Sequence, residues 1–203
     1  MLQNKDQHEK SIAVFHQRGG IVRTSEAMRA GIHPRTLYAM QGEGVIEKLS
    51  RGLYRLAALP PLGNPDLVAV SKRVPNGVIC LISALSFHEI TTQIPHEVHL
   101  AVSRNAQVPR IDYPPIRIFR FSGSSYSEGI EQTKVDDVSL RIYSPAKTLA
   151  DCFKYRNKIG LDVAIEALKL YRGTKRFSVD EVMYFARACR VEKVMRPYLE
   201  AIL

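Results

Sequence analysis

The sequence is poor in cysteine and has no long apolar run, and each absence excludes a class of protein. Three of its 203 residues are cysteine, widely spaced, which fits neither a zinc ribbon nor a disulfide framework and indicates a reducing compartment. The longest apolar stretch, residues 78–85, is much shorter than the roughly 20 residues that a membrane-spanning helix needs. The polar opening, residues 1–10, does not resemble a signal peptide. We therefore expect a cytoplasmic protein with no membrane partner.

The chain also lacks the short motifs by which many enzymes are recognised. It contains no Walker A loop, dinucleotide fingerprint or nucleophile elbow. The histidines of residues 88–99 lack the spacing of four on one helix face that a zincin needs. His96 and His99 would point to opposite faces of a strand, which disfavours a shared metal. We therefore expect no enzyme activity, no cofactor and no metal site.

One pair of acidic residues superficially resembles a nucleotidyltransferase signature. Asp136 and Asp137 follow a Gly-Ser pair at residues 123–124. The chemistry needs two carboxylates separated by one residue, so that both face one Mg²⁺ from the same strand. Because these aspartates are adjacent, their side chains diverge, and a turn before a strand at Val138 explains them better.

The charge of the chain indicates a polyanionic partner. Lys and Arg number 29 against 20 Asp and Glu, which leaves a formal net charge of +9. Residues 1–60 contain nine basic and five acidic side chains, and residues 144–203 contain twelve and seven. The middle of the chain is balanced. Basic segments of this kind attract nucleic acid.

A cluster of three prolines and a glycine at residues 58–65 marks a boundary in the chain. Proline fixes φ and disfavours helix in the residue before it, so regular structure should stop there. We expect two domains, residues 1–60 and 64–203, in an α+β fold.

The first domain has the element order of a winged helix-turn-helix. The pattern predicts a helix, a short strand, two short helices and a hairpin, at residues 6–18, 21–23, 26–30, 34–41, 45–49 and 53–56. Gly19-Gly20 ends the first helix, Thr24 or Ser25 can cap the second, and Pro34 suits the first turn of the third. In DNA-binding versions of this fold, the recognition helix enters the major groove.

The third helix and the hairpin supply candidate DNA contacts. Leu37 and Met40 are three residues apart and can pack inward with Ile32, which turns the other side chains outward. The candidate contacts of the helix are His33, Arg35, Thr36 and Tyr38. The hairpin adds three cations suited to phosphate groups, which are Lys48, Arg51 and Arg55. A small helical domain that contacts protein is the alternative, and the basic hairpin favours double-stranded DNA.

The second domain is predicted as a mixed α/β structure. A helix at 66–73 and a buried segment at 78–82 precede another helix at 83–90. Strands are expected at residues 96–102, 116–121 and 138–143, and helices fill the rest, starting near residues 145, 161, 179 and 194. Ser178 begins a capping box with Glu181.

One of these helices carries a candidate basic surface. Lys147, Lys154 and Lys158 are spaced by seven and four residues, so on a single helix they would share a face. We expect that face to meet DNA or an acidic protein surface. An ordinary solvated helix face is the alternative.

Three segments resemble the AbiEi family of type IV antitoxins. The first, residues 50–56 (SRGLYRL), resembles the wing of that family. The second, residues 77–95, resembles the start of its C-terminal domain. The third, residues 144–154 (SPAKTLADCFK), resembles its later Ala-Lys-Thr-Leu-x-Asp block. The similarity runs in the same order over residues 8–200.

The resemblance implies an antitoxin of a toxin–antitoxin system that acts in phage defence by abortive infection. It implies a winged helix that represses its own operon at operator inverted repeats. It also implies a C-terminal domain that counters a cognate AbiEii-type nucleotidyltransferase toxin, directly or functionally. Two alternatives stay open: a stand-alone transcriptional regulator without a toxin partner, and an enzyme that acts on nucleic acid through a site without a familiar motif.

Overall fold

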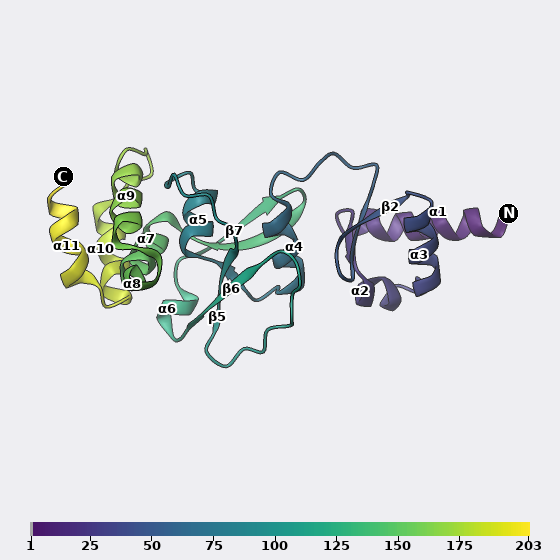
Figure 1. The fold of residues 1–203 in the computed structure, drawn as a ribbon, viewed down its shortest axis with the longest axis horizontal. Helices are drawn as coiled ribbons and strands as arrows, with labels where there is room; N and C mark the ends of the chain where they lie inside the picture. The colour runs from purple at the N-terminus through teal and green to yellow at the C-terminus, as the bar shows by residue number, and fades with distance from the viewer. Residues whose placement is uncertain (1) are drawn as a thin grey trace. The chain divides into compact units, whose positions relative to one another are not determined.

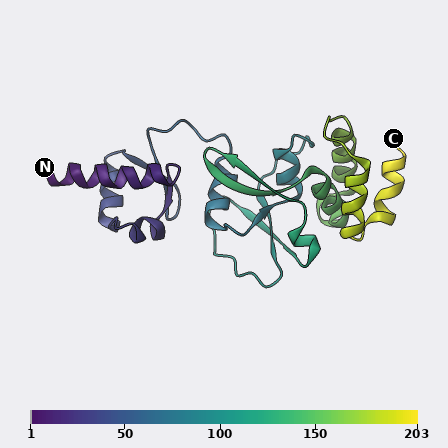
Figure 2. The same cartoon turned by 180° about the vertical axis from the view of Figure 1, so that it is seen from behind.

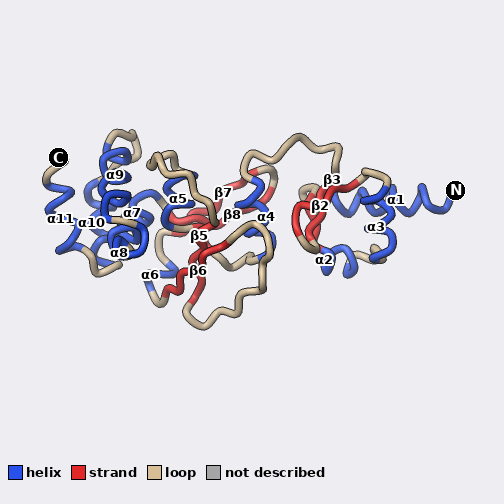
Figure 3. Tube along the Cα trace, viewed as in Figure 1, coloured by secondary structure: helices blue, strands red, loops and turns tan. Residues whose placement is uncertain are grey.

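A computed structural model of the chain describes residues 2–203, with side chains from residue 8 onward. The residues form two compact units. The first unit contains the chain up to Val74 together with the short segments Pro109–Pro114 and Lys134–Ser139, and the second contains the rest. Figure 1 follows the chain by colour, and Figure 3 marks its helices and strands.

The first unit contains the winged helix-turn-helix that the sequence predicts. Its elements are α1 (Leu2–Gln17), β1 (Ile21–Arg23), α2 (Thr24–Arg29), α3 (Pro34–Gly42), β2 (Ile46–Ser50) and β3 (Leu53–Leu56). The strands form an antiparallel sheet in the order β1-β3-β2. Side chains from the helices and the sheet share one core, which includes Phe15, Val22, Leu37, Met40 and Ile46.

Local residue chemistry sets the boundaries of these helices. Gly19 and Gly20 follow α1 with φ of 72° and 76°, a conformation that glycine adopts without steric cost. The N-cap of α2 is Arg23, so the prediction of Thr24 or Ser25 was wrong. The reason is Glu26, whose carboxylate accepts the Arg23 backbone N–H at 2.9 Å and so satisfies the donor from within the helix.

The helix α4 (Pro65–Arg73) groups with the first unit, although it follows the proline cluster. Lys72 Nζ donates hydrogen bonds to the carbonyl oxygens of Ile21 at 3.1 Å and Arg18 at 3.3 Å. These bonds join α4 to the turn that precedes β1. By its contacts the unit therefore extends past residues 60–64, where the proline cluster interrupts regular structure.

A five-stranded mixed sheet forms the centre of the remaining chain. Its strands are β4 (Val78–Ile79), β5 (Val98–Ser103), β6 (Ile116–Phe121), β7 (Ile130–Val135) and β8 (Val138–Tyr143), in the order β6-β5-β4-β8-β7. β4 pairs antiparallel with β5 and parallel with β8, and β5 pairs parallel with β6. Two helices interrupt the strands, α5 (Leu81–Phe87) and the short α6 (Ser124–Ser127). The fold is therefore α+β with a mixed second part, as predicted.

The hairpin between β7 and β8 explains the adjacent aspartates. Asp136 and Asp137 form its two-residue turn with φ of 49° and 61°. Two positive φ angles are typical of a type I′ turn, in which Asp is tolerated. Both side chains are exposed, so the interpretation as a turn holds.

The last third of the chain is helical. It contains α7 (Pro145–Lys154), α8 (Arg156–Ile159), α9 (Leu161–Arg172), α10 (Val179–Ala188) and α11 (Glu192–Glu200). The last three lie side by side in both views, green to yellow in Figures 1 and 2. Helix α7 packs against α5, α9, α10 and α11. The Ser178 hydroxyl accepts the Glu181 N–H at 3.3 Å, which confirms this part of the predicted cap of α10.

The surroundings of α7 correct the predicted basic face. Lys147 is fully buried, whereas Lys154 and Lys158 are exposed. Every residue from Pro145 to Phe153 is buried, because neighbouring elements cover this helix on all sides. The prediction of one shared face was wrong, because α7 ends at Lys154 and Lys158 lies on the separate helix α8. Lys147 has no solvated face, so that residue cannot contribute to a basic surface.

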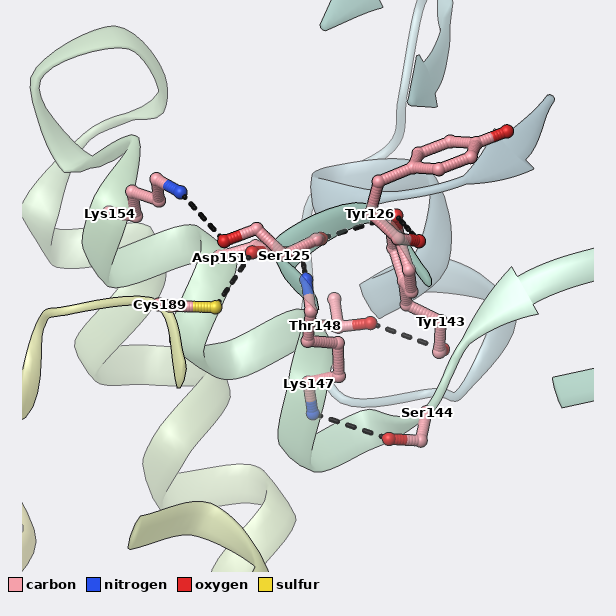
Figure 4. Close-up of polar contacts among 9 residues, drawn as sticks. All are labelled: Ser125, Tyr126, Tyr143, Ser144, Lys147, Thr148, Asp151, Lys154 and Cys189. Carbon is pink, nitrogen blue, oxygen red and sulfur yellow. Dashed lines mark hydrogen bonds and ion pairs between the residues drawn. The ribbon is translucent and has the colours of Figure 1, made fainter. Parts of the chain in front are cut away.

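The Lys147 ammonium is instead paired inside the core (Figure 4). Its Nζ lies 2.5 Å from Oδ2 of Asp151, which is also fully buried. The Cys189 thiol donates to the other carboxylate oxygen at 3.3 Å. The ring of Tyr143 lies 4.1 Å from Nζ and that of Phe121 5.0 Å, which places the cation over two aromatic faces. Burial raises the pKa of the Asp151 carboxyl, and Lys147 opposes that rise.

We predict that removing one partner of this pair costs much more stability than removing an exposed charge. Asp151→Ala leaves an unpaired ammonium in the core, and we expect a loss of about 3–5 kcal/mol in the free energy of unfolding. The double variant Lys147→Met, Asp151→Leu buries no charge and should recover most of that loss. Urea unfolding measures both variants together with the control Lys169→Ala, an exposed position on α9 whose change in free energy of unfolding is expected to stay within about 0.5 kcal/mol. If Asp151→Ala unfolds at the same urea concentration as the control, the pair is not a structural requirement.

Candidate nucleic-acid interface

Helix α3 has one buried face and one exposed face. Leu37 and Met40 are 1% and 0% exposed, and they anchor the helix in the core of the first unit together with Ile32. Arg35 is exposed, and 66% of Tyr38 is accessible. The inward and outward positions are those that the spacing predicts. A large aromatic ring and a guanidinium therefore project from α3 toward solvent.

The N-terminus of α3 is set by His33. Its Nδ1 accepts the backbone N–H of Arg35 at 3.2 Å, which caps the helix, and Pro34 occupies the first turn. The His33 side chain is nonetheless exposed. Thr36 is half-buried at the same end. The end of α3 that meets base edges in this fold thus presents small and basic groups together.

The hairpin carries two exposed cations. Lys48 lies on β2, and Arg51 lies in the turn between β2 and β3 with 83% of its side chain exposed. Arg51 NH1 lies 3.7 Å from Asp112 Oδ2. An exposed ion pair of this length contributes little free energy, so a phosphate group can compete for the guanidinium.

The third predicted cation of the hairpin, Arg55, does not face solvent. Only 6% of its side chain is exposed. Its NH1 donates to Glu47 Oε1 at 2.6 Å, and its NH2 donates to the carbonyl oxygen of Pro60. The prediction that Arg55 contacts phosphate is corrected, because the guanidinium already joins the hairpin to the segment that follows it. It was misread because charge alone does not report burial.

Helix α2 adds a cation that the sequence analysis did not single out. Arg29 is exposed, and its Nε donates to the Ser25 carbonyl oxygen at 3.2 Å within the helix. In helix-turn-helix proteins the first helix of the pair crosses the DNA backbone. The sequence could have identified Arg29 as a candidate phosphate contact, because it is a basic residue in the last turn of the helix that precedes the recognition helix.

The three histidines of residues 88–99 have different surroundings. His88 Nε2 is 2.7 Å from the Tyr143 carbonyl oxygen, and burial lowers its pKa. His99 is buried, which lowers its pKa as well, while His96 is exposed. Over residues 8–203, no group of three or more His, Cys, Asp or Glu side chains could hold a metal ion.

The cysteines are buried and unpaired. Burial raises the pKa of Cys80 and Cys152 well above the ordinary value, so neither thiol ionises near neutral pH.

In the part of the chain that the structure describes, no helix has both the length and the hydrophobicity of a membrane span.

Comparison with known proteins found a matching family model and a solved structure of similar fold. Residues 9–57 match the family model described as "Transcriptional regulator, AbiEi antitoxin". The RV2827C protein from Mycobacterium tuberculosis, known from a crystal structure, superposes with a TM-score of 0.53 over 94% of this chain and 79% of that one, at 11% sequence identity. At that identity the likeness shows the fold alone. A search of curated proteins found no match.

The family match covers the elements that carry the interface, from within α1 to the end of β3. It includes the wing segment on which the resemblance first rested. The winged helix of this chain is therefore similar to the AbiEi antitoxin family of transcriptional regulators.

Proposed function

We propose that the chain represses its own operon by binding operator DNA and serves as the antitoxin of a nucleotidyltransferase toxin. In this proposal α3 enters the major groove of double-stranded DNA, and the hairpin contacts the phosphate backbone beside it. Operator inverted repeats would then accommodate two copies, one on each half-site. No catalytic step, cofactor or metal is assigned to the chain.

The observation that carries the DNA-binding role is the two-sided character of α3. The helix is held by Leu37 and Met40, while Arg35 and Tyr38 project outward near its N-terminal end. Arg contacts guanine O6 and N7 through two hydrogen bonds, and this is the commonest specific contact in the major groove. A helix that is anchored in the core and presents an exposed Arg is suited to that role.

Phosphate contacts would come from the exposed cations beside α3. Lys48 and Arg51 lie on the hairpin, and Arg29 lies on α2. Contacts of this kind fix the position of a protein on the duplex and make the affinity depend on salt. Arg55 is left out because it is buried and paired.

The antitoxin role is supported by the family of the winged helix and by the resemblance of residues 77–95 and 144–154 to the family's C-terminal domain. We propose that the residues after the winged helix counter the toxin. The second candidate function is a stand-alone regulator without a toxin. A neighbouring gene with a Gly-Ser…Asp-x-Asp signature would favour the antitoxin.

Arg35→Ala should weaken recognition of the operator without unfolding the protein. We expect a loss of about 1–3 kcal/mol in operator binding and a smaller difference between operator and unrelated DNA. Fluorescence anisotropy with both duplexes measures this, using the DNA upstream of the gene as the operator. Arg187→Ala, an exposed arginine on α10, is the control and should bind as the unmodified protein does. An Arg35→Ala variant that keeps the full difference would exclude α3 as the reading surface.

Arg51→Ala should weaken binding to all DNA sequences alike. Loss of one phosphate contact should reduce the slope of log K against log salt concentration by about 0.9. Arg55→Ala should instead leave that slope unchanged and lower the melting temperature, because it removes a buried, hydrogen-bonded side chain. Identical salt slopes for Arg51→Ala and the unmodified protein would contradict the proposed wing contact.

Repression and protection should be separable. Arg35→Ala should lose repression of a reporter driven by the operator, yet still protect cells that express the neighbouring nucleotidyltransferase from a separate promoter. The reason is that the proposed protective residues lie outside the winged helix. Failure of the unmodified chain to protect would favour the stand-alone regulator.

A further inference from the structure

A pocket of about 630 Å³ opens among the helices of the second unit. Three segments line it, which are the loop from Ser122 to Ser125, the residues Lys154 and Arg156 at the junction of α7 and α8, and the loop from Ala188 to Val191 between α10 and α11. We propose that this pocket binds a triphosphate group, either as inorganic triphosphate or as part of a nucleoside triphosphate. The proposal is independent of DNA binding by the winged helix.

The lining of the pocket is strongly basic. Lys154, Arg156 and Arg190 carry three positive charges, and no lining residue is acidic. None of the three forms an ion pair with any side chain from residue 8 onward. Lys154 donates only to the Ser125 hydroxyl at 3.3 Å, and Arg156 to the Phe153 carbonyl oxygen at 2.9 Å. Three uncompensated cations around one recess favour an anionic occupant.

The buried carboxylate that contacts the pocket-lining Cys189 does not neutralise these charges. Asp151 lies behind Cys189, which lines the pocket, but its own side chain is fully buried. Its charge is matched by Lys147 at 2.5 Å (Figure 4). The buried pair therefore leaves the positive charge of Lys154 and the two arginines facing the pocket.

Hydroxyl groups complete the donor set. Ser122, Ser124 and Ser125 belong to the lining, and the first two are exposed. Gly123, which lies between Ser122 and Ser124, has a φ of 55° and a ψ of −142°, a conformation that L-amino acids with side chains rarely adopt. Guanidinium, ammonium and hydroxyl donors together are the groups that hold phosphate oxygens in proteins.

The pocket fits a small phosphate ligand better than a nucleic acid. Its volume is within the range of small-molecule sites, about 300–1,000 Å³. The phosphates of a duplex lie on a convex surface, which fits a recess less well than a small ligand does. No aromatic side chain lines the pocket, so the base has no stacking partner there. We therefore expect recognition of the triphosphate, with little preference among bases.

Isothermal titration calorimetry on the full chain tests the proposal, with ATP, GTP and inorganic triphosphate as probes at constant ionic strength. We expect saturable binding of all three at one site. Arg190→Gln and Lys154→Gln should each weaken binding by about tenfold or more, since each removes a charge-assisted hydrogen bond. Lys169→Gln changes the same charge on α9 outside the pocket and should bind like the unmodified protein. Thermal unfolding should match among the variants.

Two results would overturn the proposal. One is the absence of saturable binding for all three probes. The other is equal weakening by Arg190→Gln and Lys169→Gln, which would mean that overall charge attracts the anions. Weaker binding of duplex DNA by Arg190→Gln, with no triphosphate binding, belongs to the first case and would assign this face to nucleic acid.

Discussion

The buried ion pair of Lys147 and Asp151 is the constraint on which the second unit depends. Both side chains lie within α7, one turn apart, and neither reaches solvent. A single buried charge is unfavourable, so the pair must form, and Cys189 at the end of α10 donates to the carboxylate as well. The packing of α5, α9, α10 and α11 around α7 encloses this pair. Among the described side chains, Asp151 is the only buried acidic group, and Lys147 neutralises it. The pair therefore leaves no unmatched buried negative charge next to the basic pocket.

The parts of the fold that could be predicted are those in which a short residue pattern has a single local cause. Gly19-Gly20, Pro34 and the spacing of Leu37 and Met40 each act locally, and the winged helix follows the predicted order. Strand β7 was missed because it is polar and half-exposed, which leaves no apolar alternation to detect. Arg55 and Lys147 were misplaced for another reason. Both side chains are buried by the tertiary fold, and burial of this kind is not visible in a periodicity, although Lys147 and Asp151 have the i, i+4 spacing of a helical ion pair.

The proposed functions use separate sets of residues. Operator recognition is assigned to α3 and the hairpin, which lie within the segment that matches the antitoxin regulator family. The proposed nucleotide pocket lies in the second unit, between the loop before α6 and the loop after α10. Because no residue is shared, variants in one set should leave the other unaffected. Separate sets also allow DNA binding and triphosphate binding to be examined in the same chain.

The central claim is that α3 reads DNA, and a crystal structure of the full chain with its operator duplex tests it most directly. The account predicts that α3 lies in the major groove, with Arg35 within hydrogen-bond distance of a base edge and Arg51 at a phosphate. Arg55 should remain paired with Glu47 as it is in the free protein. A complex in which α3 faces solvent, or in which the duplex contacts only the second unit, would contradict the account.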